Sequence, residues 1–265
     1  MTQWIDLDKK VVIITGGAVG IGAKLTENLH GNGAQVVIAD VSIDEEYESE
    51  GIDYIACDVT KKQDVDRLVS EVNYKYGKVD ALINNAGVNR ARLLVDYYND
   101  DPNHELSEDD FEFMVNVNQK GVFLCSQAVA KVMIKQQSGV IINISSEAGA
   151  EGSKGQSVYS MTKGAVNSLT LSWAKELGQF NVRVVGVAPG INEPTPMGNP
   201  SHVRDLAYTR GIDPENVSTD YQKVIPLGRP GKLTEIADLV TYLVSDHSSY
   251  ITGTVMNITG GKSRG

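Results

Sequence analysis

The segment VVIITGGAVGIG, residues 11–22, joins a strand pattern to a glycine-rich turn and the beginning of a helix pattern. Its first four residues, Val11 to Ile14, are continuously apolar, as in a strand buried on both faces of a parallel sheet. Glycines at positions 16, 20 and 22 allow a tight turn and a close approach of the backbone to a ligand. This order predicts a pyrophosphate at the helix N-terminus, although glycines also serve ordinary strand-to-helix turns.

Runs rich in Val and Ile alternate with helix patterns over the whole 265-residue chain. The runs lie at residues 11–15, 35–39, 53–56, 80–84, 139–145, 182–188 and 254–258. The helix patterns lie at residues 20–32, 61–76, 107–137, 157–178 and 234–245. Since no linker or repeat interrupts the alternation, we expect a single α/β domain over residues 1–265. Its fold should be Rossmann-like, a doubly wound parallel sheet of seven strands with helices on both faces.

The composition argues against several classes of protein. A formal net charge of -10 opposes binding to nucleic acid. No window approaches the roughly twenty apolar residues of a membrane span, so we expect a cytoplasmic protein with no membrane partner. Cys57 and Cys125 lie among apolar neighbours, and neither they nor the four histidines have the spacing of a metal site. We therefore expect no metal.

Asp40 ends the second predicted strand. Its carboxylate could accept hydrogen bonds from the ribose hydroxyls of a dinucleotide, and it would repel a 2′-phosphate. No Arg or Lys stands at positions 17, 18 or 41 to hold such a phosphate. The pattern therefore predicts NAD rather than NADP, with a merely solvated carboxylate as the alternative.

The third and fourth strand patterns are also followed by residues that suit a cofactor. Asp58 and Val59 could contact an adenine edge, and NNAG at 84–87 offers small residues and amides. The carboxyl ends of parallel strands form the edge where such sheets bind ligands. Asn84 and Asn85 could instead cap a turn.

The segment YSMTK, residues 159–163, places Tyr159 and Lys163 one helical turn apart. Positions i and i+4 share a helix face, so both side chains can point into one cleft. A nearby ammonium favours phenolate, which should lower the pKa of Tyr159 from about 10. Tyr159 is thus a candidate general base; the alternative is a half-buried packing residue.

Two further polar residues belong with this pair. Ser146 follows the fifth predicted strand, and no histidine adjoins it to make it a nucleophile. We interpret it as a hydrogen-bonding group that orients the substrate. Asn118, placed at the beginning of the long helix, could hold a water beside Lys163, or it could simply cap the helix.

These motifs, with PG at 189–190, resemble the short-chain dehydrogenase/reductase family over nearly the whole chain. The resemblance implies a catalytic tetrad of Asn118, Ser146, Tyr159 and Lys163, NAD-dependent oxidation of a CH–OH group, and a homotetramer. It implies cofactor contacts at Gly16, Gly20, Ile21, Gly22, Asp40, Asp58, Val59, Asn85, Ala86, Gly87, Tyr159, Lys163, Pro189, Gly190, Ile191 and Thr195. One departure is that Thr195 stands five residues after Gly190, where the family usually has four.

A closer similarity within the family is carried by SSEAGAEGSKGQSVYS at 145–160, among other segments. It implies a phosphorylated polyol as substrate and a phosphorylated ketose as product. Basic residues near the predicted site could bind the phosphate: Arg90, Arg92, Lys154, Arg204 and Arg210. Glu147 and Glu151 could accept hydrogen bonds from sugar hydroxyls, or could be solvated loop charges. A lid is expected at about 194–225, because long insertions at strand ends usually serve function.

Three alternatives remain open on the sequence alone. The first is another enzyme of the same family, acting on a different polyol, a sugar acid or a 3-oxoacyl substrate. The second is a non-catalytic NAD-sensing protein, and the third is a structural oligomer. The complete tetrad argues against the second, and Asp40 argues against an NADP-dependent reductase.

Overall fold

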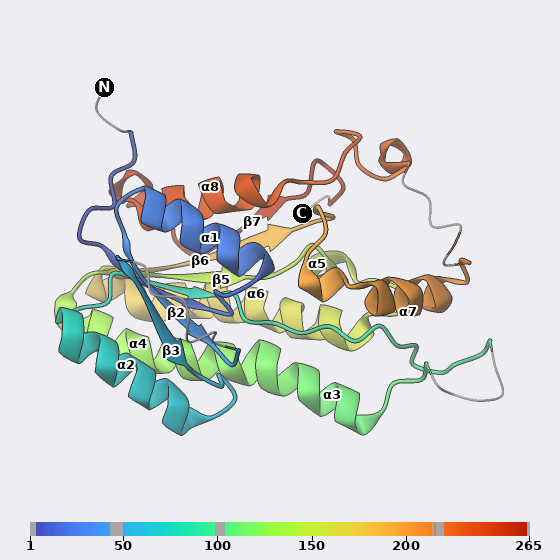
Figure 1. Ribbon diagram of the computed structural model, residues 1–265, viewed down its shortest axis with the longest axis horizontal. Coiled ribbons are helices and arrows are strands. Elements are labelled where there is room, and N and C mark those ends of the chain that lie inside the picture. Colours follow the sequence, from blue (N-terminus) through green and yellow to red (C-terminus); the bar gives the residue numbers. More distant parts are fainter. Residues whose placement is uncertain (1–3, 43–49, 99–103, 214, 216–219, 264–265) are drawn as a thin grey trace.

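A computed structural model describes residues 4–42, 50–98, 104–213, 215 and 220–263 (Figure 1). Within these residues seven strands form one parallel sheet in the order β3-β2-β1-β4-β5-β6-β7. The strands are β1 (Val11–Thr15), β2 (Gln35–Asp40), β3 (Ile52–Ala56), β4 (Ala81–Asn84), β5 (Gly139–Ile144), β6 (Val182–Pro189) and β7 (Thr254–Ile258). The predicted fold is confirmed, and each strand boundary lies within one residue of the predicted one.

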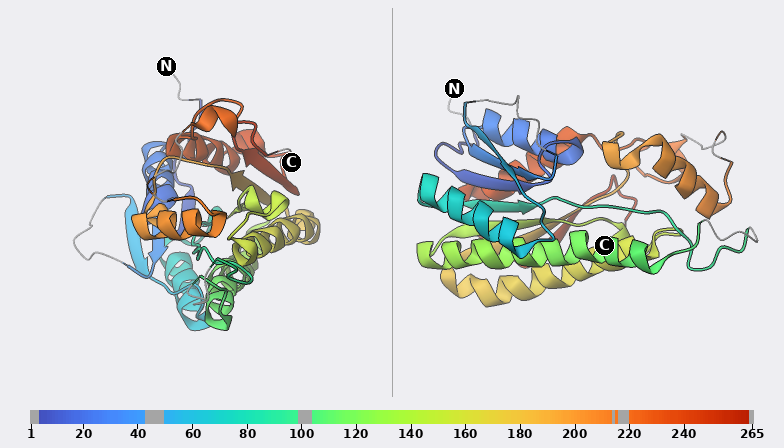
Figure 2. Two further views of the ribbon diagram at one scale, coloured as in Figure 1. Left: turned by 90° about the vertical axis from the view of Figure 1, so that its right-hand side faces the viewer. Right: turned by 60° about the horizontal axis from the view of Figure 1, so that its bottom comes forward.

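Helices cover both faces of the sheet (Figures 1 and 2). On one face lie α2 (Lys62–Tyr76), α4 (Val122–Gln136) and α6 (Ser157–Leu177), whose apolar residues share one core cluster. On the other face lie α1 (Gly20–Gly31) and α8 (Leu233–Val244). Continuously apolar strands suit this arrangement, because alternate residues of each strand enter opposite cores.

The alternation is visible along β1. Val11 and Ile13 pack in the core beneath α2 and α4, whereas Val12 and Ile14 pack in the core beneath α1 and α8. All four side chains are almost completely buried. The sheet is therefore held from both sides, and its carboxyl edge becomes a fixed platform for the loops that follow the strands.

The long helix predicted over 107–137 contains a π-helical segment. It consists of α3 (Glu108–Val115), a π-helical segment (Asn116–Gly121) and α4. Asn118 thus lies within a continuous run of helix, and its predicted place at the helix beginning is wrong. A π segment inserts an extra residue into the turn and is common at functional sites; here it carries Asn118, which is fully buried.

The direction of strand addition reverses between β1 and β4, which is where open α/β sheets bind ligands. The short helix α5 (Ala148–Glu151) and the helix α7 (Pro200–Arg210) lie at this end of the molecule (Figure 1). Neither helix was predicted. The expected lid contains α7, and its residues 214 and 216–219 lie outside the described residues.

None of the helices in the described part of the chain has the length and apolar character needed to cross a membrane.

Candidate active site

The glycine turn between β1 and α1 requires glycine. Gly16 and Gly20 have φ of 64° and 59°, which residues with a side chain rarely adopt. A Cβ on Gly22 would lie only 1.9 Å from the carbonyl oxygen of Gly16. The N-cap residue Val19 makes no side-chain cap, so the first N–H groups of α1 are left for an anion, with Ile21 in this first turn.

Asn85 ties the glycine turn to the end of β4. Its Nδ2 donates to the carbonyl oxygens of Thr15, at 3.2 Å, and Gly16, at 2.8 Å. The Thr15 hydroxyl in turn accepts the backbone N–H groups of Asn85 and Ala86, each at 3.1 Å. Asn85 and Ala86 therefore lie at the turn. Thr15 was not singled out, although its place as the last strand residue before the glycines was a signal.

Asp40 lies across the same turn. One carboxylate oxygen accepts the N–H of Ala18 at 3.2 Å, and the other accepts the N–H of Ser42 at 3.2 Å. The structure thus brings the acid at the end of β2 to the phosphate cradle. This is the arrangement in which a carboxylate reads the ribose of a dinucleotide.

Asp58 and Val59 are fixed by their own loop. The Asp58 carboxylate accepts the N–H and hydroxyl of Thr60 at 3.0 and 2.7 Å and pairs with Lys61 at 3.2 Å. Burial opposes ionisation of Asp58, but the bonds from Thr60 outweigh it and hold its pKa below the ordinary value. Val59 packs so closely on the π segment that a Cβ on Gly121 would lie 2.8 Å from it. The Asp58 carboxylate therefore already has hydrogen-bond and ion-pair partners within its own turn.

The segment after β6 returns to the glycine turn. Pro189 and Gly190 are held by backbone hydrogen bonds of 3.0 and 3.1 Å to Glu147 and Ile258. The Cβ of Thr195 lies 3.4 Å from the point that a Cβ on Gly20 would occupy. Thr195 is thus brought to the turn in spite of its longer spacing from Gly190.

The four residues of the predicted tetrad meet at this edge. A Cβ on Gly87 would lie 3.5 Å from both Asn118 Oδ1 and Lys163 Nζ. Lys163 Nζ is 5.8 Å from the centroid of the Tyr159 ring, so these two side chains share one face of α6. The Ser146 side chain lies close enough to Tyr159 to favour its ionised form.

Asn118 is anchored by three hydrogen bonds. Its Oδ1 accepts the N–H of Val88 at 2.8 Å, and its Nδ2 donates to Val88 O at 2.9 Å and to the Thr162 hydroxyl at 3.0 Å. Thr162 also donates to the carbonyl of Tyr159 at 2.7 Å. Because both side-chain N–H groups are used, the water predicted here would have to donate to an oxygen of Asn118. Thr162 and Val88 were not predicted.

The pKa of Tyr159 departs from the sequence prediction. Burial raises it above its ordinary value, and the Ser146 side chain only partly opposes this. The charge of Glu147 raises it further. Lys163 is buried, with its Nζ 2.8 Å from Ile144 O, and burial lowers its pKa from the ordinary value near 10.5 to about 8. The expected lowering of the Tyr159 pKa by Lys163 is therefore not found in the protein alone.

The lowered pKa of Lys163 makes stability depend on pH. Between pH 8 and about 10.5 the unfolded chain keeps a proton at Lys163 that the folded chain has released, so the free energy of unfolding rises with pH. Relative to Lys163→Met, we expect the wild-type value to rise by about 2–3 kcal/mol from pH 7 to pH 10. Urea unfolding of both proteins measures this difference in the free energy of unfolding. Tyr159 is present in both proteins, so its own titration cancels in the difference. A difference that stays constant or falls with pH would contradict the lowered pKa.

Arg90 and Arg92 are engaged by acidic residues. Arg90 forms a 2.6 Å ion pair with Asp110 and lies 4.4 Å from the Phe113 ring centroid. Arg92 forms a 2.9 Å ion pair with Asp205 on α7. The predicted role of these arginines as phosphate ligands therefore lacks support, since each already has a carboxylate partner.

Glu147 and Glu151 face a lysine that was not predicted. Lys262, near the end of the chain, lies 2.6 Å from Glu147 and 3.8 Å from Glu151. Glu147 is 9% exposed, so it is not a solvated loop charge. Its Oε2 is buried without a hydrogen-bond partner among the described residues. That oxygen is free to accept from a bound ligand.

The other three basic residues predicted to bind the phosphate form no ion pair with any described residue. Lys154 donates to the Tyr98 hydroxyl at 3.0 Å, and Arg210 donates to the Ser153 hydroxyl at 3.4 Å. Arg204 is exposed, and no hydrogen bond or ion pair joins it to any described residue. Sequence spacing could not separate these residues from Arg90 and Arg92.

The two cysteines lie in the core beneath α2 and α4. Burial raises the pKa of both thiols, that of Cys57 to about 11, so neither is a reactive thiolate. Over the described ranges, no group of three or more His, Cys, Asp and Glu side chains is arranged to hold a metal ion.

Comparison with known proteins identifies the family. The family model of short chain dehydrogenases matches residues 10–204. The chain is 48% identical to a sorbitol-6-phosphate 2-dehydrogenase of Klebsiella pneumoniae over the full length of both, and 40% identical to a 3-oxoacyl-[acyl-carrier-protein] reductase of Thermotoga maritima over 96% of this chain and 98% of that one. A solved structure of NAD⁺-bound xylitol dehydrogenase, 30% identical, superimposes with a TM-score of 0.85 over 96% of this chain and 99% of that one. The protein is a member of the short-chain dehydrogenase family and an oxidoreductase.

Proposed function

We propose that the protein oxidises D-sorbitol 6-phosphate at C2 to D-fructose 6-phosphate, with NAD as the second substrate. The observation that carries the chemistry is the meeting of Ser146, Tyr159 and Lys163 beside the glycine turn. The substrate is inferred from the relative of Klebsiella pneumoniae, which matches over its whole length. Glu147, with its unpartnered buried oxygen, suits a substrate rich in hydroxyl groups.

The residues of the glycine turn fit a dinucleotide. A side chain would clash at Gly16 and Gly22, Gly20 has a φ of 59° that favours glycine, and the first amides of α1 would hold a pyrophosphate. Asp40 would accept hydrogen bonds from the adenosine ribose, and its charge favours NAD over NADP. When bound, NAD would supply the acceptor for the hydride that leaves C2.

The side chains handle the proton of the same reaction. Tyr159 would take the proton of the C2 hydroxyl while Ser146 holds the oxygen. The raised pKa of Tyr159 means that phenolate needs a further positive charge nearby, for which protonated Lys163 and an oxidised nicotinamide are the candidates. Lys163 and a water donating to Asn118 would pass the proton outward. We infer that the described residues 194–213 and 220–225 close over the site during transfer, because Thr195 already lies on the glycine turn.

A second candidate is reduction of a 3-oxoacyl substrate, which the 40% identity to the Thermotoga maritima enzyme favours. Steady-state assays at the NADH absorbance separate the two. We expect turnover of D-sorbitol 6-phosphate with NAD, with kcat/KM at least about tenfold above that with NADP. Faster turnover of a 3-oxoacyl thioester, with NADPH preferred, would replace the first proposal with the second. The absence of turnover on either substrate would favour a non-catalytic NAD-binding protein.

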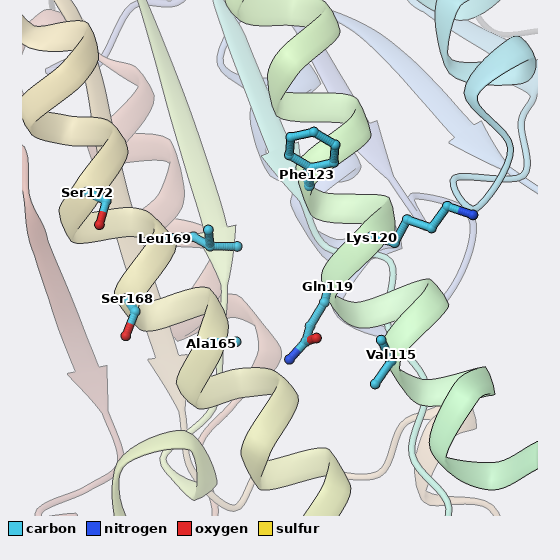
Figure 3. Close-up of a pocket in the computed structure, with 8 residues that line it drawn as sticks. All are labelled: Val115, Gln119, Lys120, Phe123, Ala165, Ser168, Leu169 and Ser172. Carbon is cyan, nitrogen blue, oxygen red and sulfur yellow. The ribbon is translucent and has the colours of Figure 1, made fainter. Parts of the chain in front are cut away.

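We also infer a homotetramer. Figure 3 shows a pocket between α4 and α6, lined by Val115, Gln119, Lys120, Phe123, Ala165, Ser168, Leu169 and Ser172. Phe123 and Leu171, on these two helices, are each 43% exposed, which is unusual for large apolar side chains unless another surface covers them. A second copy of the same helix pair would cover them and form a dimer, and two such dimers would make the tetramer. Light scattering should give the mass of four chains, and a mass of one or two chains would contradict the tetramer.

A further inference from the structure

We propose that Lys154 and Arg210, together with the hydroxyls of Ser153 and Tyr98, bind the phosphate group of the substrate. The inference rests on the proposed function, which supplies a phosphorylated polyol. It assigns the phosphate to a cluster formed by the loop at 152–156 and the end of α7.

The four residues are brought together by close backbone packing. A Cβ on Gly155 would lie 2.0 Å from the Thr209 hydroxyl, so the loop before α6 rests directly on the last turn of α7. The hydroxyl of Tyr98 lies 2.8 Å from the point that a Cβ on Gly211 would occupy. Because Lys154 donates to that hydroxyl, its ammonium lies beside the chain that carries Arg210.

Arg210 contacts the same loop. Its guanidinium donates to the hydroxyl of Ser153, the residue before Lys154, at 3.4 Å. That hydroxyl donates to Gln156 Oε1 at 2.7 Å and would turn to a bound phosphate. An ammonium and a guanidinium therefore lie at one short loop, each in contact with a hydroxyl. Charged donors of this kind, supported by hydroxyls, are the usual ligands of a phosphate.

The charges around the cluster favour an anion. Over the described residues neither Lys154 nor Arg210 forms an ion pair, whereas Arg90, Arg92 and Lys262 all do. Asp96 is the acid nearest to Tyr98, and both its oxygens accept the hydroxyl of Tyr208 at 3.0 Å.

Two pKa shifts agree with this geometry. The hydrogen bond from Lys154 lowers the pKa of the Tyr98 hydroxyl, as a cation beside it should. Burial lowers the pKa of Arg210, and no carboxylate among the described residues offsets the cost of its charge. A phosphate dianion would stabilise both cations.

The loop that carries Ser153 and Lys154 leads directly into α6, the helix that carries Tyr159. The loop ends at Gln156, which caps α6, and the N–H of Ser160 donates to the Gln156 carbonyl at 2.8 Å. Tyr159 stands in this same first turn. A substrate whose C2 hydroxyl meets Tyr159 can therefore extend toward Lys154 and Arg210 with the phosphate at its far end.

The test compares phosphorylated and unphosphorylated sorbitol. In Lys154→Met and in Arg210→Met, the ratio of kcat/KM for sorbitol 6-phosphate to that for sorbitol should fall by about tenfold to a hundredfold, mostly through KM. Arg204→Met removes the same charge from the same helix and should leave the ratio within about twofold. An unchanged ratio in both variants, or an equal fall in Arg204→Met, would overturn the assignment.

A second measurement does not depend on turnover. With the glycine turn occupied by saturating NADH, inorganic phosphate should raise the Tm of the wild-type protein and should not raise that of the Lys154→Met/Arg210→Met double variant. An equal rise in both proteins, or no rise in the wild type, would overturn the subsite. If sorbitol 6-phosphate is not oxidised but the phosphate effect is lost in the double variant, the proposed substrate fails while the phosphate subsite stands.

Discussion

Tyr159→Phe should lower kcat by about a hundredfold to ten-thousandfold while leaving the affinity for NADH within about twofold. Phenylalanine keeps the ring that packs at the site and removes only the hydroxyl whose ionisation Ser146 favours. Because the ring and Lys163 keep their places, the glycine turn and Asp40 are undisturbed. The measurements are NADH formation for turnover and NADH fluorescence for binding.

The matched control is Tyr242→Phe. This change also removes one tyrosine hydroxyl, here from an exposed 3.4 Å hydrogen bond to the His247 carbonyl rather than from the tetrad. Its effect on kcat should be several-fold at most, since surface polar contacts contribute little. Comparable turnover in Tyr159→Phe and the wild type would refute the role of Tyr159 as the base.

Gly22→Ala should weaken NAD binding by on the order of a hundredfold, because the new methyl group would clash with backbone. The nearest atom to the added Cβ is the carbonyl oxygen of Gly16, at 1.9 Å, and a backbone atom cannot move aside as a side chain can. Overpacking of this kind costs up to about 3 kcal/mol. The strain falls on the turn whose amides would hold the pyrophosphate.

Gly31→Ala is the matched control for this change. Gly31 is the last residue of the same helix, and a Cβ there would meet no atom within 4 Å. Alanine should be neutral or should stabilise the helix by about 0.5–1 kcal/mol. Calorimetry gives the NAD affinity of both variants, and unchanged affinity in Gly22→Ala would mean that the cofactor does not use this turn.

The parts of the fold that could be predicted are those set by local sequence. The inner strands β1, β2, β4, β5 and β6 are mostly apolar because both their faces are buried, and that pattern can be recognised without knowledge of the partners. The glycine turn could also be predicted from local sequence, since Gly16 and Gly20 need a backbone conformation that favours glycine. Tyr159 and Lys163 were found because one helical turn fixes their relation.

What could not be predicted depends on contacts between distant segments. The π segment exists where Asn118 bonds to Val88 and Thr162, thirty and forty-four residues away. The pairing of Arg92 with Asp205 spans 113 residues, and no spacing rule connects them. The pKa of Tyr159 was predicted with the wrong sign because the pattern showed the cation but not the burial.

The most direct test of the central claim is oxidation of sorbitol 6-phosphate deuterated at C2, in the presence of NAD. We expect the deuterium to appear in the reduced cofactor, with fructose 6-phosphate as the other product and a slower rate than with the protonated substrate if bond cleavage limits turnover. Unlabelled NADH from this substrate would show that another carbon is oxidised, and would contradict the account.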